Sequence, residues 1–519
     1  MSPSVVTVVI LALAVIAFVS GRIPTGLVAV GVSLALLATG ILDLPQAFAG
    51  FSDPAVILIA SLFVVSEGLD SSGLTAWTGR QLVQRGGGEP RRLTMLVMLV
   101  VAVLSALISV NGAVAALLPV VVVIASRIAV APGRLLLPLA FGAHAGSLLT
   151  LTGSPVNVLL SEYAAASAGR PFGFFEFALV GVPLVIGSVL IAVLLGRRLI
   201  PTRSPATMTK DLSEHARTLL REYPSVESDS LIAADAGVAE VLIPPRSPLV
   251  GAHAFPGMVT DSGDLVLLAV HRGGEAVEGE STLEAGDVLL LEGRWEHLDA
   301  NLADPAVLVV DQPDAVRRQA APLGWRAWTA LAILIVMVVL LATGVFPPAV
   351  TGLLAAAAMV LTRVVSVERA HRSISWTTLL LVAGMIPLST AITLTGTAAT
   401  IATGLIDLVG GAGPTAVLAA LCVVAAIFGQ LISNTATALI IAPIAVSVAA
   451  TLDVSPLPFL MGMAVVCAAA FLTPVATPAN FMVMGPSGLR FTDYWKLGLP
   501  LLLLFLTAAI GLVPLIWPF

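Results

Sequence analysis

The chain has 519 residues, of which 58% are hydrophobic and only 11% are charged, and its formal net charge is −6. Soluble domains carry roughly 25% charged residues, so this composition excludes a soluble enzyme, a nucleic-acid-binding protein and a disordered scaffold. It predicts a polytopic membrane protein without enzymatic activity.

The charged residues gather in the middle of the chain. Residues 197–324 hold more than half of them, and acidic residues outnumber basic ones in that segment. We therefore predict a membrane block at 1–196, a soluble insert at 197–324 and a second membrane block at 325–519. The two membrane blocks have nearly equal lengths, which indicates an internal duplication.

The first block contains apolar runs near the length of roughly 20 residues that crosses a bilayer. In chain order they cover 4–20, 24–42 and 53–69, then two arms at 93–108 and 113–130, a run from about 135 that is interrupted at 152–157, and a last run at 176–196. The two arms flank the polar sequence Ser109-Val110-Asn111-Gly112.

The second block repeats this plan. Its runs cover 326–343, 347–362 and 376–396, then two arms at 414–431 and 437–450, a run from about 456 that is interrupted at 473–480, and a final run at 496–517. The two arms here flank Ser433-Asn434-Thr435.

The polar interruptions recur at matching separations in the two blocks. Asn157 follows Asn111 by 46 residues, and Asn480 follows Asn434 by 46 residues. A second register pairs Ser109 with Ser433 and Asn111 with Thr435, because a proline follows each serine by ten residues. The sequence leaves both registers open.

Arginine placement predicts the orientation. When each pair of arms is taken as a re-entrant hairpin, nearly all basic residues near the span ends fall on one face, which is then cytoplasmic. We therefore predict an all-α polytopic protein of two inverted repeats, each with five crossings and one re-entrant hairpin. A small α+β cytoplasmic domain is inserted between the repeats, both termini are extracytoplasmic, and the location is the inner (plasma) membrane.

The four interruptions are predicted to form one site near the middle of the membrane. Unwound backbone at this depth is tolerated where protein buries it or where it lines a wet cavity. The helix N-termini that follow the interruptions favour an anion. Unwound carbonyls and the Ser, Thr and Asn oxygens suit a small hard cation such as Na⁺.

The stretch Ile432-Ser433-Asn434-Thr435-Ala436-Thr437-Ala438 resembles the Ser-Asn-Thr signature of the divalent-anion/sodium symporters, which belong to the ion-transporter superfamily. Residues 152–157 and 476–480 resemble the Thr-Pro-type motifs of that family, and the resemblance covers both membrane blocks. It implies Na⁺-coupled symport of sulfate, citrate or dicarboxylates by an elevator motion, in a homodimer.

The resemblance assigns the substrate and ion site by position. The predicted site residues are Ser109, Asn111, Gly112, Ser154, Pro155, Asn157, Ser433, Asn434, Thr435, Thr477, Pro478 and Asn480, with His144, Thr152 and Thr473 as further candidates. We assign Na⁺ to Asn111, Ser154, Asn434 and Thr477.

Two features qualify the assignment. The first tip reads Ser109-Val110-Asn111-Gly112 instead of Ser-Asn-Thr, so one amide or hydroxyl is missing or displaced, and sulfate becomes comparable to a dicarboxylate as substrate. His144 is an ionisable residue inside a span, so it is a candidate to bind substrate or carry a proton, and equally a candidate to hydrogen-bond a neighbouring carbonyl.

The insert begins with a charged, helix-compatible connector at 197–223. From about 226 to 310, short apolar alternations separated by glycines predict strands at Val238–Ile243, Leu265–Val270 and Asp287–Leu291. The phrases at 239–251 and 283–293 resemble the C-terminal subdomain of potassium-conductance regulators. This resemblance implies a dimerising regulatory domain that binds a small ligand, in some bacteria cyclic di-AMP. Arg246, His253, His271 and Arg272 are candidates for a local basic patch.

Other readings remain open at this point. A ligand-gated anion channel would also fit the regulatory module, and a proton-coupled transporter or an oxyanion exporter would fit the broken spans. The sequence shows no zinc-ligand spacing and no nucleophile–base pair, so the only expected cofactor is the coupling ion Na⁺. The expected partners are a small anion, membrane lipid and a second copy of the chain, with no nucleic acid.

Overall fold

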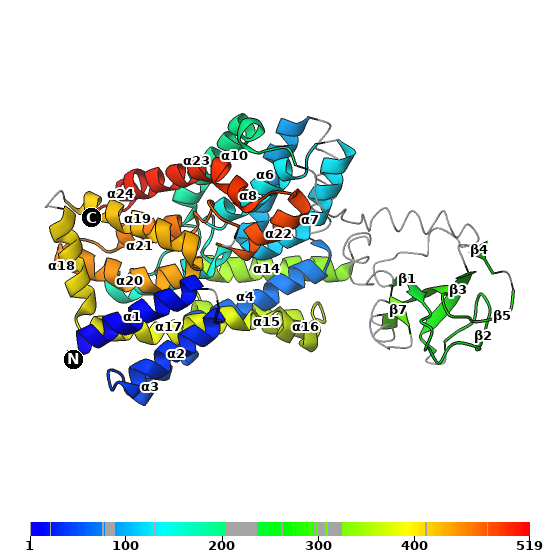
Figure 1. Cartoon of the computed structure of the whole chain (residues 1–519). Helices are drawn as coiled ribbons and strands as arrows, with labels where there is room; N and C mark the ends of the chain where they lie inside the picture. Colours follow the sequence, from blue (N-terminus) through cyan, green and yellow to red (C-terminus); the bar gives the residue numbers. More distant parts are fainter. Residues whose placement is uncertain are drawn as a thin grey trace. The chain divides into compact units, whose positions relative to one another are not determined.

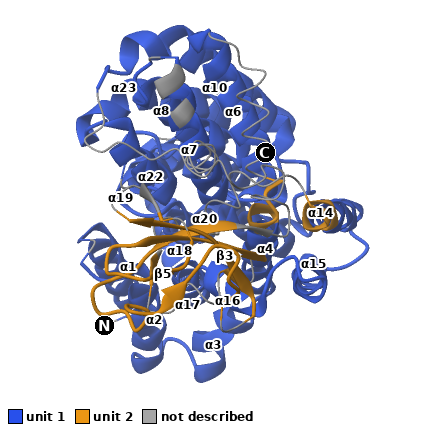
Figure 2. Ribbon diagram, turned by 90° about the vertical axis from the view of Figure 1, so that its right-hand side faces the viewer, with its two compact units in different colours: residues 1–68, 78–209, 330–519 blue, residues 69–77, 210–329 orange. Residues whose placement is uncertain are grey.

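A computed structural model describes most of the chain, which forms two compact units (Figures 1 and 2). The described residues are 2–20, 22–74, 77, 89–128, 130–203, 236–260, 263–272, 275–277, 279–294, 297–298, 307–309, 324–409, 413–474 and 476–519. The first unit comprises residues 1–68, 78–209 and 330–519, so both outer blocks of the sequence contribute to it. Most of the predicted connector at 197–223 lies outside the described residues.

The first half of the chain supplies helices in the predicted order. They are α1 (Pro3–Ser20), α2 (Thr25–Ala38), α3 (Leu44–Phe48), α4 (Pro54–Ser71), α6 (Pro90–Leu107), α7 (Val110–Arg127), α8 (Gly133–Gly146), α9 (Pro155–Ala168) and α10 (Ala178–Leu199). The α8 helix ends before the predicted interruption, and α9 begins within it.

The second half supplies a matching series. Its helices are α14 (Trp325–Thr343), α15 (Pro348–Leu361), α16 (Val367–Ser373), α17 (Trp376–Leu394), α18 (Thr397–Val409), α19 (Pro414–Leu431), α20 (Asn434–Thr451), α21 (Leu457–Cys467), α22 (Pro478–Ser487), α23 (Tyr494–Thr507) and α24 (Val513–Ile516). The sequence reading did not include the short helices α3 and α16, nor α18.

In the described part of the chain, nine helices are long and apolar enough to cross a membrane. This confirms the prediction of a polytopic membrane protein. The hairpin arms α6, α7, α19 and α20 each have 18 residues, which corresponds to about 27 Å of helix. This length is close to the thickness of the hydrocarbon core, so length alone does not distinguish a re-entrant arm from a crossing helix.

Two helix pairs pack closely because small residues let the backbones approach. A methyl group on Gly384 of α17 would lie 2.7 Å from the carbonyl oxygen of Ala29 on α2, and Ser33 of α2 donates to the Gly384 carbonyl at 2.9 Å. On the other pair, a methyl group on Gly352 of α15 would lie 3.1 Å from the Ser61 Cβ of α4. Such small-residue contacts are the usual means of helix packing in membranes.

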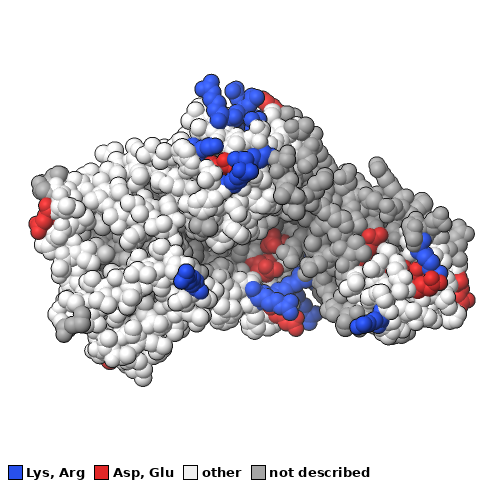
Figure 3. Space-filling model, viewed as in Figure 1, with Lys and Arg blue, Asp and Glu red and all other residues white. Residues whose placement is uncertain are grey.

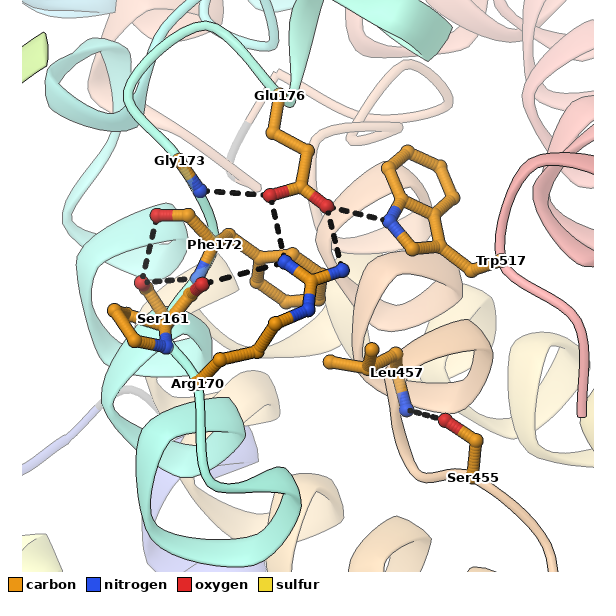
Figure 4. Close-up of polar contacts among 9 residues, drawn as sticks. Ser161, Arg170, Phe172, Gly173, Glu176, Ser455, Leu457 and Trp517 are labelled. Carbon is orange, nitrogen blue, oxygen red and sulfur yellow. Dashed lines mark hydrogen bonds and ion pairs between the residues drawn. The ribbon is translucent and has the colours of Figure 1, made fainter.

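A polar cluster ties the loop between α9 and α10 to the C-terminal end of the chain (Figure 4). The Arg170 guanidinium donates to both oxygens of Glu176 at 3.0 Å. Glu176 also accepts from the Gly173 N–H at 2.7 Å and from the Trp517 indole at 2.7 Å. Ser161 of α9 accepts from the Phe172 N–H at 3.0 Å. The end of the second half is thereby fixed to the first half.

The second unit comprises residues 69–77 and 210–329, and its described residues form antiparallel sheets. The strands are β1 (Ala236–Leu242), β2 (His253–Ala254), β3 (Leu265–Arg272), β4 (Glu275–Ala276), β5 (Ser281–Thr282), β6 (Val288–Arg294) and β7 (Leu308–Val309). The larger sheet has the order β4-β3-β6-β1-β7, and β2 pairs with β5. β1, β3 and β6 overlap the three strands expected from the apolar alternation.

The core of this unit is built from inward-facing residues of the central strands, including Val241, Leu267, Leu289 and Leu291. At its edge, the buried carboxylate of Asp287 receives two hydrogen bonds of 2.8 Å from Arg272. This pairing with Arg272 holds the pKa of Asp287 below its usual value.

Candidate substrate and ion site

Each hairpin tip ends in a serine that caps the second arm. Ser109 accepts from the Gly112 N–H at 3.2 Å at the start of α7, and Ser433 accepts from the Ala436 N–H at 3.2 Å at the start of α20. Serine is a preferred N-cap because its hydroxyl satisfies a free N–H of the first turn. The two caps correspond, so the structure has the register that pairs Ser109 with Ser433.

This register places Val110 where the second tip has Asn434, because each residue directly follows its capping serine. Asn111 lies one residue further on, opposite Thr435, and its side chain is exposed. The first tip therefore carries an apolar side chain at the position where the second tip carries an amide.

The two broken helices restart in the same way. Ser154 caps α9 by accepting from the Val156 N–H at 3.2 Å, and Thr477 caps α22 by accepting from the Asn480 N–H at 3.3 Å. Pro155 and Pro478 occupy the first helical positions, where a missing N–H costs nothing. The caps fix the places where both helices begin.

A buried asparagine braces each break. The side-chain amide of Asn157 donates to the carbonyls of Ser147 and Thr150 at 2.8 and 2.9 Å. The amide of Asn480 donates to the carbonyls ten and seven residues before it, those of Ala470 and Thr473, at 2.6 and 3.1 Å. The spacing along the chain is identical, so one amide holds each unwound segment in shape.

The carbonyl ends of these side chains take no part in bracing the breaks. Among the residues that the structure describes, no hydrogen bond to the buried Oδ1 atoms of Asn157, Asn434 and Asn480 meets the distance and angle criteria, and the His144 side chain lies beside that of Asn480. The side chains of Asn157 and Asn480 are almost completely buried, at 1% and 0% exposure. Buried oxygens without donors are unfavourable unless a water molecule, a ligand or an ion supplies the missing partner.

Threonines connect each break to the neighbouring hairpin. Thr150 donates to the Ala106 carbonyl at 2.5 Å, and Thr473 donates to the Gln430 carbonyl at 3.3 Å. Gln430 also accepts from the Leu472 N–H at 2.9 Å, so it supports the second break. The sequence reading named Thr473 and Thr152 but missed Thr150. Thr152 is buried, and its hydroxyl lies 3.4 Å from that of Thr150.

His144 reaches from the first half to the second break. Its Nε2 lies 3.1 Å from the hydroxyl of Thr477, and the ring is 2% exposed beside the edge-oriented ring of Phe471. The contact follows from the packing of α22 on α8. His144 therefore touches a predicted ion ligand.

The breaks and the hairpins interlock across the two halves. α9 packs on α20 and α21, whereas α22 packs on α7 and α8. Each helix that restarts after a break thus lies against the hairpin of the other half. The tips and breaks contain no charged side chain, and the described residues hold no cluster of metal-ligating His, Cys, Asp and Glu.

Two glycines that the sequence reading missed lie against the breaks. A methyl group on Gly181 of α10 would come within 2.1 Å of the Leu148 carbonyl oxygen, and one on Gly498 of α23 would come within 2.2 Å of the Phe471 carbonyl oxygen. Only glycine allows such an approach. The recurring sequence Gly-x-Pro, at 181–183 and 498–500, is the signal that could have identified them.

Comparison with known proteins agrees with the resemblance of the two membrane blocks to a transporter family. The sequence profile of the citrate transporter family matches residues 15–453 and 408–519. The uncharacterized transporter YfbS of Escherichia coli is 31% identical over 98% of this chain and 98% of its own length. Sodium/sulfate cotransporter 1 of Chlamydomonas reinhardtii is 26% identical over 49% of this chain and 30% of its own length.

Among solved structures, the crystal structure of the YdaH transporter of Alcanivorax borkumensis aligns with 93% of this chain and 90% of its own, at 15% identity and a TM-score of 0.48. The family match spans nearly the whole chain, including both hairpins and both breaks. The chain therefore belongs to the citrate transporter family and is a multi-pass membrane transporter.

Proposed function

We propose that the protein is a secondary active transporter that couples Na⁺ to the import of a divalent anion, either sulfate or a dicarboxylate. The observation that carries this proposal is the pair of buried asparagines, Asn157 and Asn480. Each has its amide bound to the unwound backbone, and neither buried carbonyl oxygen receives a well-formed hydrogen bond from the described residues. The sodium/sulfate cotransporter among the relatives supports both the ion and the anion.

The chemistry of the free groups favours an alkali cation. The unpartnered atoms of Asn157, Asn434 and Asn480 are all amide oxygens, and unwound carbonyls and hydroxyls lie near them in sequence. Neutral oxygen ligands suit Na⁺ at the broken helices of transporters. Asn434 and Thr477 would serve the second half, and Ser154 and Asn111 remain the predicted Na⁺ ligands of the first half.

The anion would be held without cationic side chains. Four helices, α7, α9, α20 and α22, begin at the tips and breaks, and each N-terminus carries partial positive charge. Thr435 and the serine caps add hydroxyls at the same places. This arrangement suits a small doubly charged anion that is accompanied by Na⁺.

We include an elevator motion in the proposal, because hydrogen bonds join the breaks to the hairpins and to each other. Thr150 joins the first break to α6, Thr473 joins the second break to α19, and His144 joins α8 to Thr477. Bonds of this kind would keep the tips and breaks together while they move as one body. Two inverted repeats, extracytoplasmic termini, an inner-membrane location and a homodimer belong to the same proposal.

The soluble unit is proposed to regulate transport by binding a small ligand on the cytoplasmic side. Its expected basic patch is partly occupied by internal pairs: Arg272 bonds to Asp287 and Glu284, and His253 lies 3.7 Å from Glu280. A phosphate ligand such as cyclic di-AMP would have to compete with these carboxylates.

Uptake into proteoliposomes tests the proposal. Radiolabelled sulfate, succinate and citrate are supplied under an inward Na⁺ gradient, and the expected result is uptake of at least one anion that stops when choline replaces Na⁺ at fixed pH. If uptake persists in choline and follows a pH gradient, the coupling ion is the proton and not Na⁺. Unitary currents in planar bilayers would indicate a channel, and no uptake of any of the three anions would refute the assignment.

A further inference from the structure

A small pocket lies between α6, α8 and α10, away from the tips and breaks. Its volume is about 130 Å³, and its lining includes Arg91, Thr94, Arg134, Ala192, Gly196 and Arg197. We propose that this pocket binds the phosphate group of an anionic membrane lipid.

The lining of the pocket carries positive charge and no carboxylate. Three arginines from three different helices line it, no Asp or Glu does, and none of the three forms an ion pair in the described part of the chain. The Nε of Arg134 is buried without an acceptor. By contrast, Arg170 and Arg203 are paired with Glu176 and Asp493. A buried guanidinium donor without a partner calls for an anion from outside.

The start of α6 adds a second attraction for an anion. Pro90 and Arg91 line the pocket at the first turn of this 18-residue helix. The side chain of the preceding Glu89 makes no capping hydrogen bond to this turn. Helix N-termini of this kind bind phosphate groups.

The surroundings favour a lipid as the source of the phosphate. Further along the same two helices, α10 exposes Leu190 and Leu194, and α6 exposes Leu99 and Val103. These apolar side chains lie one to three turns from the arginines, where acyl chains would run below a bound headgroup. Figure 3 shows basic side chains gathered over this end of the membrane unit, whereas most of the same face carries no charge. Basic pockets between transmembrane helices bind lipid headgroups in this way.

Native mass spectrometry of the full-length protein tests the site. The protein in detergent is first incubated with phosphatidylglycerol, with phosphatidylcholine, or with inorganic phosphate and no lipid. It is then released from the detergent in the spectrometer, and the bound molecules are identified by mass. The wild type is expected to retain phosphatidylglycerol in preference to phosphatidylcholine. Arg134→Gln and Arg197→Gln should each weaken retention by about fivefold, the usual effect of one arginine near anionic lipid.

Two matched variants separate the pocket from general surface charge. Arg198→Gln removes the neighbouring arginine that does not line the pocket and should leave retention unchanged. Ala192→Leu fills the pocket without altering charge and should reduce retention. Arg197 is exposed, so Arg197→Gln keeps the test valid if a variant at a buried position fails to fold.

The proposal is overturned if phosphatidylglycerol and phosphatidylcholine are retained equally, or if Arg197→Gln and Arg198→Gln behave alike. If inorganic phosphate binds and phosphatidylglycerol does not, the proposal that the phosphate group in the pocket comes from a lipid is wrong. None of these outcomes depends on whether the protein transports anions.

Discussion

An asparagine side chain carries a hydrogen-bond donor and an acceptor on one rigid group. In both breaks, the donor binds the unwound backbone and the acceptor is left for another partner. The amides of Asn157 and Asn480 hold the unwound backbone in place, which fixes the position of two buried amide oxygens. Because each oxygen is fixed by the same group that shapes the break, the Asn157 and Asn480 side chains would already be oriented for the proposed ion.

The register of the tips gives a matched pair of substitutions. Asn434→Val places the valine of the first tip at the second tip. We expect the Na⁺ concentration for half-maximal uptake to rise about ten- to hundredfold. The reason is that a polar contact to a charged group contributes about 1.5–3 kcal/mol to binding. Val110→Asn adds the missing oxygen to the first tip and should retain uptake. Na⁺-dependent uptake curves provide the measurement, and an unchanged Na⁺ dependence in folded Asn434→Val would exclude Asn434 as a ligand.

His144 is expected to orient the hydroxyl of Thr477. His144→Leu removes its partner and should raise the half-maximal Na⁺ concentration by about two- to tenfold, the range of one neutral hydrogen bond. His144→Gln retains a polar group and should restore much of the loss, while the KM for the anion stays close to that of the wild type. If the Leu and Gln variants have equal Na⁺ dependence, His144 does not position Thr477.

Residue-level prediction from the sequence depended on recurrence. Asn157 and Asn480 stood out because they repeat at one spacing, and Ser109 and Ser433 because each precedes an apolar arm. The contact between His144 and Thr477 could not be predicted, because it joins residues 333 positions apart through the packing of α8 on α22. The choice of register likewise required the capping hydrogen bonds.

At the scale of elements, each break is supported by a helix further along the chain, beyond the one that restarts after it. Gly181 on α10 lies against the Leu148 carbonyl, and Gly498 on α23 lies against the Phe471 carbonyl. Both carbonyls belong to unwound segments whose neighbouring backbone is held by an asparagine amide. The glycines therefore set how closely α10 and α23 approach the site.

Gly498→Ala should damage the second break. Its methyl group would lie 2.2 Å from a backbone oxygen, so the segment or the helix must shift at a cost of about 1–3 kcal/mol. We expect a lower thermal unfolding temperature and reduced uptake. Gly511→Ala is the control, because nothing lies within 4 Å of its methyl group. Equal unfolding temperatures for the two variants would contradict the close approach.

The pairing of Asp287 with Arg272 should make the β3–β6 edge sensitive to acid. The pKa of Asp287 is lowered from 3.8, so its stabilising contribution is present above that pH and is lost as the pH falls through the lowered pKa. Hydrogen exchange of the full chain, corrected for intrinsic rates, should show loss of protection in β3 and β6 at low pH. Asp287→Asn should lose protection already at neutral pH, whereas the exposed Glu284→Gln should resemble the wild type.

The sequence predicted the long helices well, because each apolar run is bounded by polar or glycine-rich residues. It placed the starts of the breaks too late. The unwound segments begin at Ser147, directly before the apolar pair Leu148-Leu149, and at Ala468, the first residue of the apolar stretch Ala468–Phe471. Hydropathy could not reveal these starts, because the carbonyls there are satisfied by side chains that follow later in the chain.

At the scale of the whole molecule, the two halves of the chain form one compact unit because helices of each half pack against helices of the other. The restarted helix of each half packs on the hairpin of the other, and the loop bearing Glu176 holds Trp517 near the C-terminus. The sequence indicated the duplication through equal block lengths and spacing. It could not show the interlocking, because contacts between distant segments leave no periodic pattern in either half.

The central claim is that Na⁺ and a divalent anion cross together, and coupling must then work in both directions. The most direct test loads proteoliposomes with equal Na⁺ on both sides, applies an inward gradient of the transported anion, and follows radiolabelled Na⁺. We predict transient accumulation of Na⁺ inside the vesicles, and a smaller accumulation in Asn434→Val when Na⁺ is kept below the raised half-maximal concentration of that variant. Movement of the anion without any accumulation of Na⁺ would contradict the account.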